Sequence, residues 1–360
     1  MDLSIPAELL AIQDLVRTFV KRELAPLEEQ VDADDDIDPA TMAALRQQAV
    51  KLGCYGFNLP GQIGGGGIGP LGEVLIGQEV GRTSMPLGET VGRLPQSLTF
   101  CRGEQVEWLL RRALRAEITV CPALTEPSAG SDLGGLRTRA EHTDGKWHLN
   151  GSKQFISGAD TCDYLLVLAV TDPGAPLRRR FTTFVVERDE PGVHFTTRRF
   201  RKMGWRGHHM SAFTLEDCLL GEDRVLGEVG GAEQLLHMSR DYALVRETFG
   251  RKLGDHQAIQ FMLADMDVEL EAARMLVLAG AWRAEQHDPE TRIAASRAKL
   301  YASEMAGRAA DAAMQIFGAA GYMADLPIER MYRDLRGFRL GEGTSEMQRI
   351  QIARHLLAKK

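Results

Sequence analysis

Cysteine is scarce in this 360-residue sequence, and its five cysteines are odd in number and widely spaced. Such a set favours neither a disulfide framework nor a paired-ligand metal site, and it is typical of a reducing compartment. The only adjacent histidines, His208 and His209, would point in different directions on a strand or a helix. We therefore expect no metal site.

Long apolar runs are also lacking, since the best of them covers only residues 164–170. A helix that spans a membrane needs about 20 such residues. The first residues, Met1-Asp2-Leu3-Ser4, lack the basic start of an export signal. These features predict a cytoplasmic protein that does not insert into a membrane.

Basic residues are not in excess, because the formal net charge is -7 and the sequence pI is about 5.8. This balance argues against a general nucleic-acid binder. The glycine-rich stretch 61–69 lacks the lysine and hydroxyl residue of a phosphate-binding P-loop, and no dinucleotide-binding glycine fingerprint follows a strand. A Rossmann enzyme is therefore disfavoured.

What the chain does contain is a hydrophobic content of 44%, enough for a large core and for two or three domains. Apolar residues recur at helical spacing in the first third, where Asp38-Pro39 predicts a helix start. Short β-branched runs follow, and we interpret Asp144-Gly145 and Asn150-Gly151 as tight turns. Helical stripes then return on both sides of a loop at 287–289. The pattern predicts an α+β protein with an N-terminal helical domain (1–118), a middle β domain (119–226) and a C-terminal antiparallel helical bundle (227–360).

The most distinctive stretch runs from Gly341 to Glu346, where Glu342 stands between two glycines just before the last predicted helix. Glycine lets a ligand approach closely and permits turns that other residues resist. Glu342 is therefore a candidate proton-abstracting base, although a solvated turn would have the same pattern.

Six separated blocks, taken in order, resemble the acyl-CoA dehydrogenase family of flavoproteins over nearly the whole chain. The blocks are Thr125 to Asp132, Asn150 to Ser157, Met203-Gly204-Trp205-Arg206, Arg246 to Gly250, Gln315-Ile316-Phe317-Gly318, and Gly341 to Arg349. The resemblance implies that the middle domain is β-barrel-like. It also implies α,β-dehydrogenation of an acyl-CoA thioester with FAD as hydride acceptor.

In this resemblance Glu342 matches the base that removes the Cα proton. A carboxylate is a weak base for a C–H bond, so substrate binding has to expel water and strengthen it, while donors at the thioester oxygen stabilise the developing enolate. Ser131, Arg240 and Gly341 match positions beside the substrate.

The resemblance also implies the cofactor contacts. Thr125 and Ser157 match residues that hydrogen-bond the flavin ring, and Phe155 matches an aromatic side chain that covers one ring face. The remaining matches are Arg246 and Thr248 at the pyrophosphate, Gln315 and Gly318 on the adenine side, and Thr344 and Glu346 beside the cofactor. Some of these segments reach the flavin of a neighbouring subunit in the family, which implies a homodimer or homotetramer, with electrons passing to an electron-transfer flavoprotein.

Two departures from the family pattern stand out. Gly341 occupies a position where several family members carry an aromatic residue, which predicts a wider acyl pocket. Between Gly230 and Arg246 the chain is short, and about five turns of a long helix are missing. That shortening leaves the placement of Arg240 open.

Three functional hypotheses remain open from the sequence. The first is an acyl-CoA dehydrogenase that reduces an electron-transfer flavoprotein. The second is a flavin-dependent acyl-CoA oxidase that gives electrons to oxygen. The third is a shortened, non-catalytic paralogue that binds acyl-CoA.

Overall fold

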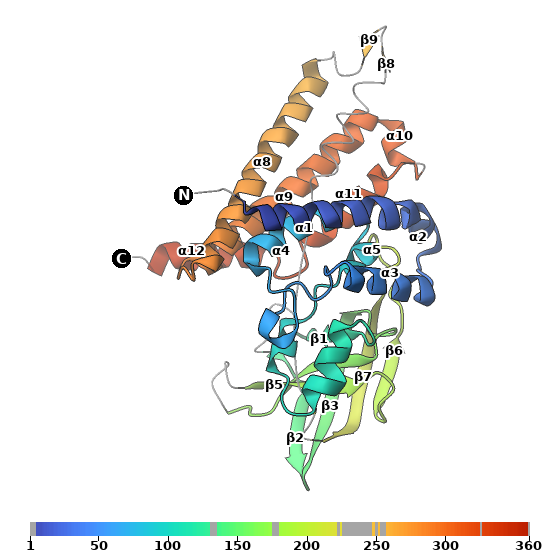
Figure 1. Ribbon diagram of the computed structural model, residues 1–360, viewed down its shortest axis with the longest axis vertical. Helices are drawn as coiled ribbons and strands as arrows, with labels where there is room; N and C mark the ends of the chain where they lie inside the picture. Colours follow the sequence, from blue (N-terminus) through green and yellow to red (C-terminus); the bar gives the residue numbers. More distant parts are fainter. Residues whose placement is uncertain are drawn as a thin grey trace.

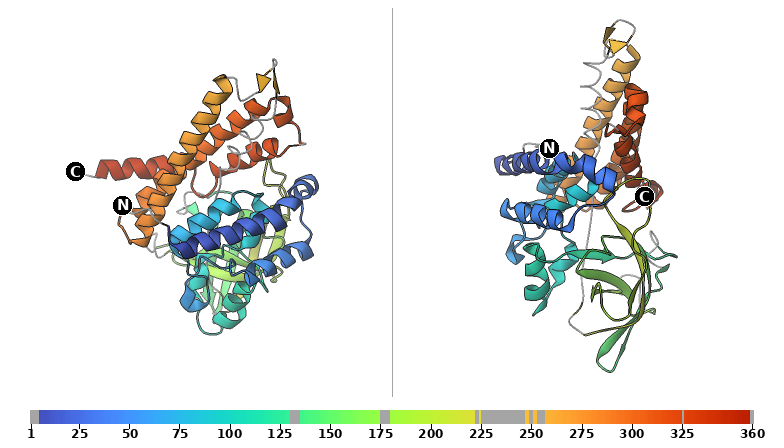
Figure 2. Two further views of the ribbon diagram at one scale, coloured as in Figure 1. Left: turned by 45° about the horizontal axis from the view of Figure 1, so that its top comes forward. Right: turned by 90° about the vertical axis from the view of Figure 1, so that its right-hand side faces the viewer.

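The computed structural model describes residues 5–129, 135–174, 180–221, 224, 247–248, 251–252, 257–324 and 326–358. Figure 1 shows the C-terminal helices at one end of the molecule, the β-sheet at the other end, and the N-terminal helices across the middle. The side view in Figure 2 separates the same three parts. The predicted α+β fold, with helices before and after a β domain, is confirmed.

The N-terminal part is helical, with loops and short irregular helices between its longer elements. Asp38 accepts a hydrogen bond from the Thr41 N–H at 2.8 Å, so the predicted helix start before Pro39 is confirmed. The elements are α1 (Ala7–Phe19), η1 (Val20–Leu24), η2 (Ala25–Leu27), α2 (Glu28–Asp34), α3 (Pro39–Lys51), η3 (Gly61–Ile63), α4 (Gly69–Val80), α5 (Met85–Gly88), η4 (Glu89–Val91), η5 (Gln96–Phe100), η6 (Val106–Arg111) and α6 (Arg112–Leu114).

The middle part is a seven-stranded sheet in the order β1-β4-β2-β3-β7-β6, with β5 paired to β4. The pairs β1/β4 and β2/β4 are parallel and the others are antiparallel. Alternate side chains of these strands form one buried core. The strands are β1 (Val120–Ala123), β2 (Arg139–Thr143), β3 (Lys146–Ser157), β4 (Tyr164–Val170), β5 (Phe181–Glu187), β6 (Val193–Thr197) and β7 (Met210–Leu220).

The turn predicted at Asn150-Gly151 is wrong, because both residues lie inside strand β3. The register of β3 against β7 shifts between Leu149 and Gly151, so the dipeptide marks a β-bulge. Asn150 Oδ1 accepts the Asp217 N–H at 2.8 Å, which gives its side chain a role across the bulge. Only the other dipeptide, Asp144-Gly145, forms the turn of the β2/β3 hairpin.

The C-terminal part is built on two long antiparallel helices, α8 (Gln257–Glu285) and α9 (Thr291–Phe317), joined by a short loop. The predicted stripes meet there, and Met266, Ala273, Met305 and Ala309 are all buried in one core. Three helices follow, α10 (Ala319–Tyr322), α11 (Ile328–Phe338) and α12 (Ser345–Ala358), and the short strands β8 (Glu247–Thr248) and β9 (Arg251–Lys252) pair before α8. Within the described ranges, none of the helices has both the length and the hydropathy to cross a membrane.

Ion pairs join the first and last parts of the chain. Arg330 on α11 contacts Glu28 on α2 at 2.6 Å, and Arg333 contacts Asp32 at 3.3 Å. Arg206 also donates to the Asp32 backbone carbonyl. These contacts bring α2, α11 and the loop before β7 together.

The β domain contains a buried ion pair between Lys153 on β3 and Glu126 after β1. Their side chains are 0% and 2% exposed, and Lys153 Nζ lies 2.9 Å from Glu126 Oε1 and 2.9 Å from the Leu124 carbonyl oxygen. Glu126 also accepts the N–H groups of Arg137 and Thr138. Burial disfavours the charge on Glu126, but these hydrogen bonds and the ammonium outweigh it and lower its pKa.

We predict that Glu126→Gln destabilises the protein strongly, because it leaves the Lys153 ammonium buried without a countercharge. Breaking one partner of a buried pair costs about 3–5 kcal/mol. The free energy of unfolding, measured by urea denaturation at pH 7, should show this loss, and the double variant Glu126→Gln/Lys153→Met should recover much of it.

The stability that ionised Glu126 contributes should also depend on pH. Because the folded-state pKa of Glu126 is lowered, this contribution should be present above the ordinary glutamate pKa and disappear as the pH falls through the folded-state value. Equal stability of the single and double variants would contradict this account.

Candidate active site

The candidate base lies in a tight loop between α11 and α12. Gly341 N–H bonds the Gly337 carbonyl at 3.0 Å, and Ser345 N–H bonds the Arg339 carbonyl at 3.2 Å. Glu342 and Gly343 follow each other in the left-handed region, with φ of 54° and 88°. A left-handed conformation costs a residue with a side chain about 1–2 kcal/mol. Glu342 therefore has a strained backbone, and its side chain is exposed.

Helix α12 starts directly after this loop, and Thr344 caps it. The Met347 N–H points at Thr344 Oγ1 at 3.4 Å. The pKa of Glu346 is lowered, first by a hydrogen bond from its own backbone N–H and then by the Thr344 hydroxyl. Thr344 and Glu346 therefore have a local role at the helix start, and both lie beside Glu342 in the chain.

Helix α9 holds the loop from one side. Lys299 Nζ donates to the Gly343 carbonyl at 2.8 Å, and Gln348 Nε2 donates to the same oxygen at 3.1 Å. Glu304, one and a half turns further along α9, contacts Arg339 at 2.9 Å and Arg349 at 3.5 Å. The loop is thus held before, within and after the candidate base.

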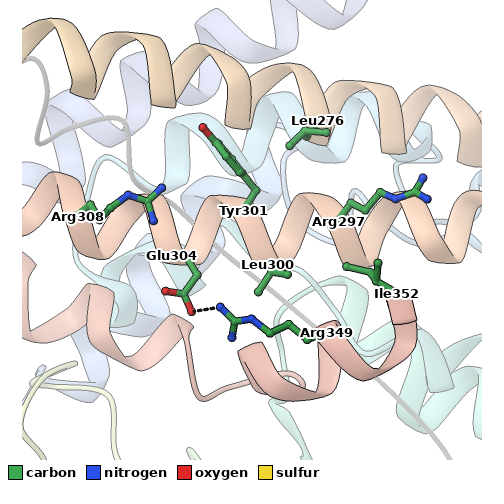
Figure 3. Close-up of a pocket in the computed structure, with 8 residues that line it drawn as sticks. All are labelled: Leu276, Arg297, Leu300, Tyr301, Glu304, Arg308, Arg349 and Ile352. Atoms are coloured by element: carbon green, nitrogen blue, oxygen red, sulfur yellow. Dashed lines mark hydrogen bonds and ion pairs between the residues drawn. The ribbon is translucent and has the colours of Figure 1, made fainter. Parts of the chain in front are cut away.

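A cavity of about 520 Å³ lies between α8, α9 and α12, next to this cluster. Figure 3 shows Tyr301 and Glu304 on α9, Leu276 on α8 and Arg349 on α12 around it. Its lining combines apolar and charged side chains, namely Leu276, Arg297, Leu300, Tyr301, Glu304, Arg308, Arg349 and Ile352.

The second part of the site lies on the β domain, around the end of β3. Phe155 has a φ of 58°, its ring is 53% exposed, and it packs against Phe200 with ring centroids 5.1 Å apart. The Gln154 N–H bonds the Thr125 carbonyl at 2.9 Å, which places Thr125 beside Phe155. Ser157 ends the strand and pairs with Met210 of β7. The structure therefore brings Thr125, Phe155 and Ser157 together.

Trp205, in the loop between β6 and β7, joins the two parts. Its backbone N–H donates to Asp334 on α11, and its ring packs edge-on against Phe338 with centroids 5.6 Å apart. A Cβ atom at Gly337 would lie 2.7 Å from Trp205 Cη2, so only glycine leaves room for the indole there. Trp205 Nε1 is buried and has no hydrogen-bond partner among the described residues, so packing holds the ring in place.

The other predicted site residues lie apart from this cluster or outside the described residues. Gln315 and Gly318 are exposed at the far end of α9, 16 positions beyond Lys299, which corresponds to roughly 24 Å along a helix. A Cβ at Gly318, where φ is 57°, would meet open space. Ser131, Arg240 and Arg246 lie outside the described residues, and only the backbone of Thr248 is described, in β8.

Sequence reasoning did not identify Lys299, Glu304 or Trp205 as site residues. Lys299 and Glu304 are charged positions on a helix that was interpreted through its apolar stripe. Trp205 was noted only as part of a resembling block. The two charged residues did carry a signal, because a partly buried charge on a core-facing helix needs a partner. Lys299 finds its partner in the loop that carries Glu342, and Glu304 finds one in Arg339 just before that loop.

The residues at the end of β3 fit a flavin. The exposed aromatic residue Phe155 offers a stacking surface for a planar heterocycle, and two residues with hydroxyl side chains, Thr125 and Ser157, are its neighbours along the backbone and can supply donors and acceptors. FAD would supply the hydride acceptor that protein side chains lack.

We predict that Gly337→Ala displaces Trp205 and lowers the free energy of unfolding by about 1–3 kcal/mol, the usual cost of overpacking. The same change at Gly341 is the matched control, because a Cβ there would meet only ordinary contacts, at 3.7 Å from the Gly337 carbonyl oxygen and 4.0 Å from Trp205 Cη2. Urea denaturation and near-ultraviolet circular dichroism of both variants test this. If Gly337→Ala were as stable as Gly341→Ala, the tight contact with Trp205 would be refuted.

Comparison with known proteins covers almost the whole chain. Three family descriptions match in order: acyl-CoA dehydrogenase N-terminal domain over 6–109, middle domain over 121–218 and C-terminal domain over 223–357. The chain is 34% identical to a probable acyl-CoA dehydrogenase of Bacillus subtilis, over 99% of this chain and 100% of that protein. It is 32% identical to (R)-benzylsuccinyl-CoA dehydrogenase of Thauera aromatica, over 99% and 97% of the two chains.

Among solved structures, butyryl-CoA dehydrogenase from Megasphaera elsdenii matches with a TM-score of 0.87 and 27% identity, over 99% of this chain and 100% of that one. The alignment with the Bacillus protein extends over 386 residues, at least 26 more than the 360 present here. At least 26 residues of that relative therefore have no counterpart in this chain, and the predicted position of the shortening, between Gly230 and Arg246, lies outside the described residues. The chain belongs to the acyl-CoA dehydrogenase family and is a flavoprotein oxidoreductase with FAD as its cofactor.

Proposed function

We propose that the protein catalyses the α,β-dehydrogenation of an acyl-CoA thioester, with Glu342 as the base that removes the Cα proton. The observation that carries this proposal is the position of Glu342, an exposed carboxylate on a loop that α9 holds and that follows helix α11. Trp205 packs on α11, and Phe200 of the same loop packs against Phe155. A carboxylate at this point has a fixed backbone and is exposed to solvent, so an incoming substrate can reach it.

The residues of the chain have separate tasks in this reaction. Glu342 takes the Cα proton onto a carboxylate oxygen. The Glu342 backbone N–H is the proposed donor to the thioester oxygen, where negative charge develops as the proton leaves. Phe155 supports one face of the flavin, and the Thr125 and Ser157 hydroxyls orient its ring. Bound FAD supplies the acceptor for the Cβ hydride.

We further propose that Ser131 and Arg240 contact the substrate and that Arg246, Thr248, Thr344 and Glu346 contact the cofactor. Gln315 and Gly318 would serve a second copy of the chain. They lie roughly 24 Å along α9 from Lys299, which is beside the proposed base, and this distance supports that assignment. An FAD bound at Phe155 of one subunit would then have its adenine end held by residues 315–318 of the neighbouring subunit. The resulting homodimer or homotetramer would pass electrons to an electron-transfer flavoprotein.

The acyl pocket is proposed to be wide beside Gly341. Gly341 has no side chain, and a Cβ there would meet only ordinary contacts with Gly337 and Trp205. The relative from Thauera acts on benzylsuccinyl-CoA, a bulky aromatic thioester, according to its name. Branched, cyclic or aromatic acyl chains are therefore the proposed substrate class.

We predict that Glu342→Gln abolishes the bleaching of bound flavin by an acyl-CoA under anaerobic conditions. Loss of a general base typically lowers the rate by about 10²–10⁴-fold. The measurement is the flavin absorbance after rapid mixing with a panel of thioesters, and the FAD content of both proteins, read before mixing, is the control. Bleaching at the wild-type rate in the variant would remove Glu342 from this role. Peroxide formation in air, without an added acceptor, would identify an oxidase instead.

We predict that Gly341→Phe narrows the pocket. The ratio of kcat/KM for aromatic thioesters to that for straight-chain thioesters should fall by at least about tenfold, the effect of one or two misplaced carbon atoms in an apolar pocket. Gly341→Ala is the matched control and should change the ratio little. If the wild-type enzyme and Gly341→Phe had the same ratio, with straight-chain thioesters preferred in both, the proposed wide pocket would be refuted.

A further inference from the structure

Lys299 is a charged side chain of α9 that contacts the base loop, the residues 341–344 that carry Glu342. Its ammonium bonds the Gly343 carbonyl at 2.8 Å, and that carbonyl belongs to the residue directly after Glu342. Burial lowers the pKa of Lys299, while the negative charge of Glu342, followed by those of Glu304 and Glu346, raises it. Lys299 therefore interacts with the candidate base through both a backbone contact and its charge.

The backbone contact restricts the direction of the base. Glu342 and Gly343 both have positive φ, and glycine at 343 leaves the loop free to take other conformations. Two donors converge on the Gly343 oxygen, the charged Lys299 and the neutral Gln348. A hydrogen bond from an ionised donor is roughly twice as strong as a neutral one, so Lys299 makes the larger contribution.

The other charged groups around the loop largely balance one another. Glu304 on α9 contacts both Arg339, which precedes the loop, and Arg349 on α12. Glu346 on α12 lies 3.7 Å from the same Arg349. About one turn beyond Glu304 on α9, Arg308 contacts Glu269 of α8 at 2.8 Å. Lys299 differs from these arginines, because its ammonium bonds the Gly343 carbonyl and interacts electrostatically with Glu342.

We propose that Lys299 is a positioning residue for Glu342: its ammonium fixes the Gly343 carbonyl and its charge keeps Glu342 ionised, ready to accept a proton. This inference rests on the proposed function of Glu342. A nearby cation favours the ionised form of a carboxylate, so Lys299 should extend to lower pH the range in which the base is deprotonated. Proton transfer from the substrate then starts from the correct ionisation state.

The experiment is a pH titration of the Glu342 carboxyl in the FAD-loaded protein without substrate. Infrared difference spectra between each protein and its Glu342→Gln counterpart isolate the signal of this one carboxyl. In Lys299→Met, which keeps most of the unbranched side chain and removes its charge, we expect the titration midpoint to rise by about one pH unit. Lys299→Arg should retain a midpoint close to that of the wild type.

Gln348→Met is the matched control, because it removes the neutral donor to the same carbonyl and leaves every charge in place. It should leave the midpoint unchanged. Equal midpoints in wild type and Lys299→Met would overturn the inference, as would an equal rise in Gln348→Met, which would reduce Lys299 to a structural contact. The readout needs no turnover, so its failure differs from a failure of the proposed function, which would appear as unbleached flavin in the wild type.

Discussion

The site depends on the packing of one indole ring between two parts of the chain. The proposed flavin surface belongs to the β domain, and the proposed base belongs to the C-terminal helices, so neither part alone can form the site. Trp205 extends from the β domain onto α11 and lies against Gly337 and Phe338, four to five residues before Glu342. The ion pairs of Arg330 and Arg333 with α2 also hold α11. Displacement of α11 would therefore move the base relative to the flavin surface.

Each part is made rigid by a buried or partly buried lysine. In the β domain, Lys153 and Glu126 bind the backbone around Thr125 and Phe155 from within the core. In the helical part, Lys299 holds the carbonyl that follows Glu342. Both lysines use a charged donor on a main-chain oxygen, a contact that is strong where little water competes for it. The strain of two successive left-handed residues at 342 and 343 persists because the surrounding contacts fix the loop.

The cavity between α8, α9 and α12 adjoins this arrangement without belonging to the flavin surface. Its lining shares Glu304 and Arg349 with the contacts that hold the base loop, so whatever fills the space also contacts the supports of Glu342. At least 26 of the 386 positions in the alignment with the Bacillus relative have no counterpart in this chain.

The sequence by itself determined the order of helices, strands and helices, because the spacing of apolar residues follows from the geometry of each element. Its resemblance to the acyl-CoA dehydrogenase family further indicated Glu342, Thr125, Phe155 and Ser157 as members of one site, because these residues lie in the short motifs that carry the resemblance. The Asn150-Gly151 dipeptide misled this reasoning, since the same two residues suit a tight turn and a bulge, and only pairing with β7 distinguishes them. The tertiary structure alone decided that Trp205 joins the two parts and that Lys299 reaches Gly343. These contacts link residues far apart in the chain, and no local pattern specifies which distant partner a buried charge or an aromatic ring will meet.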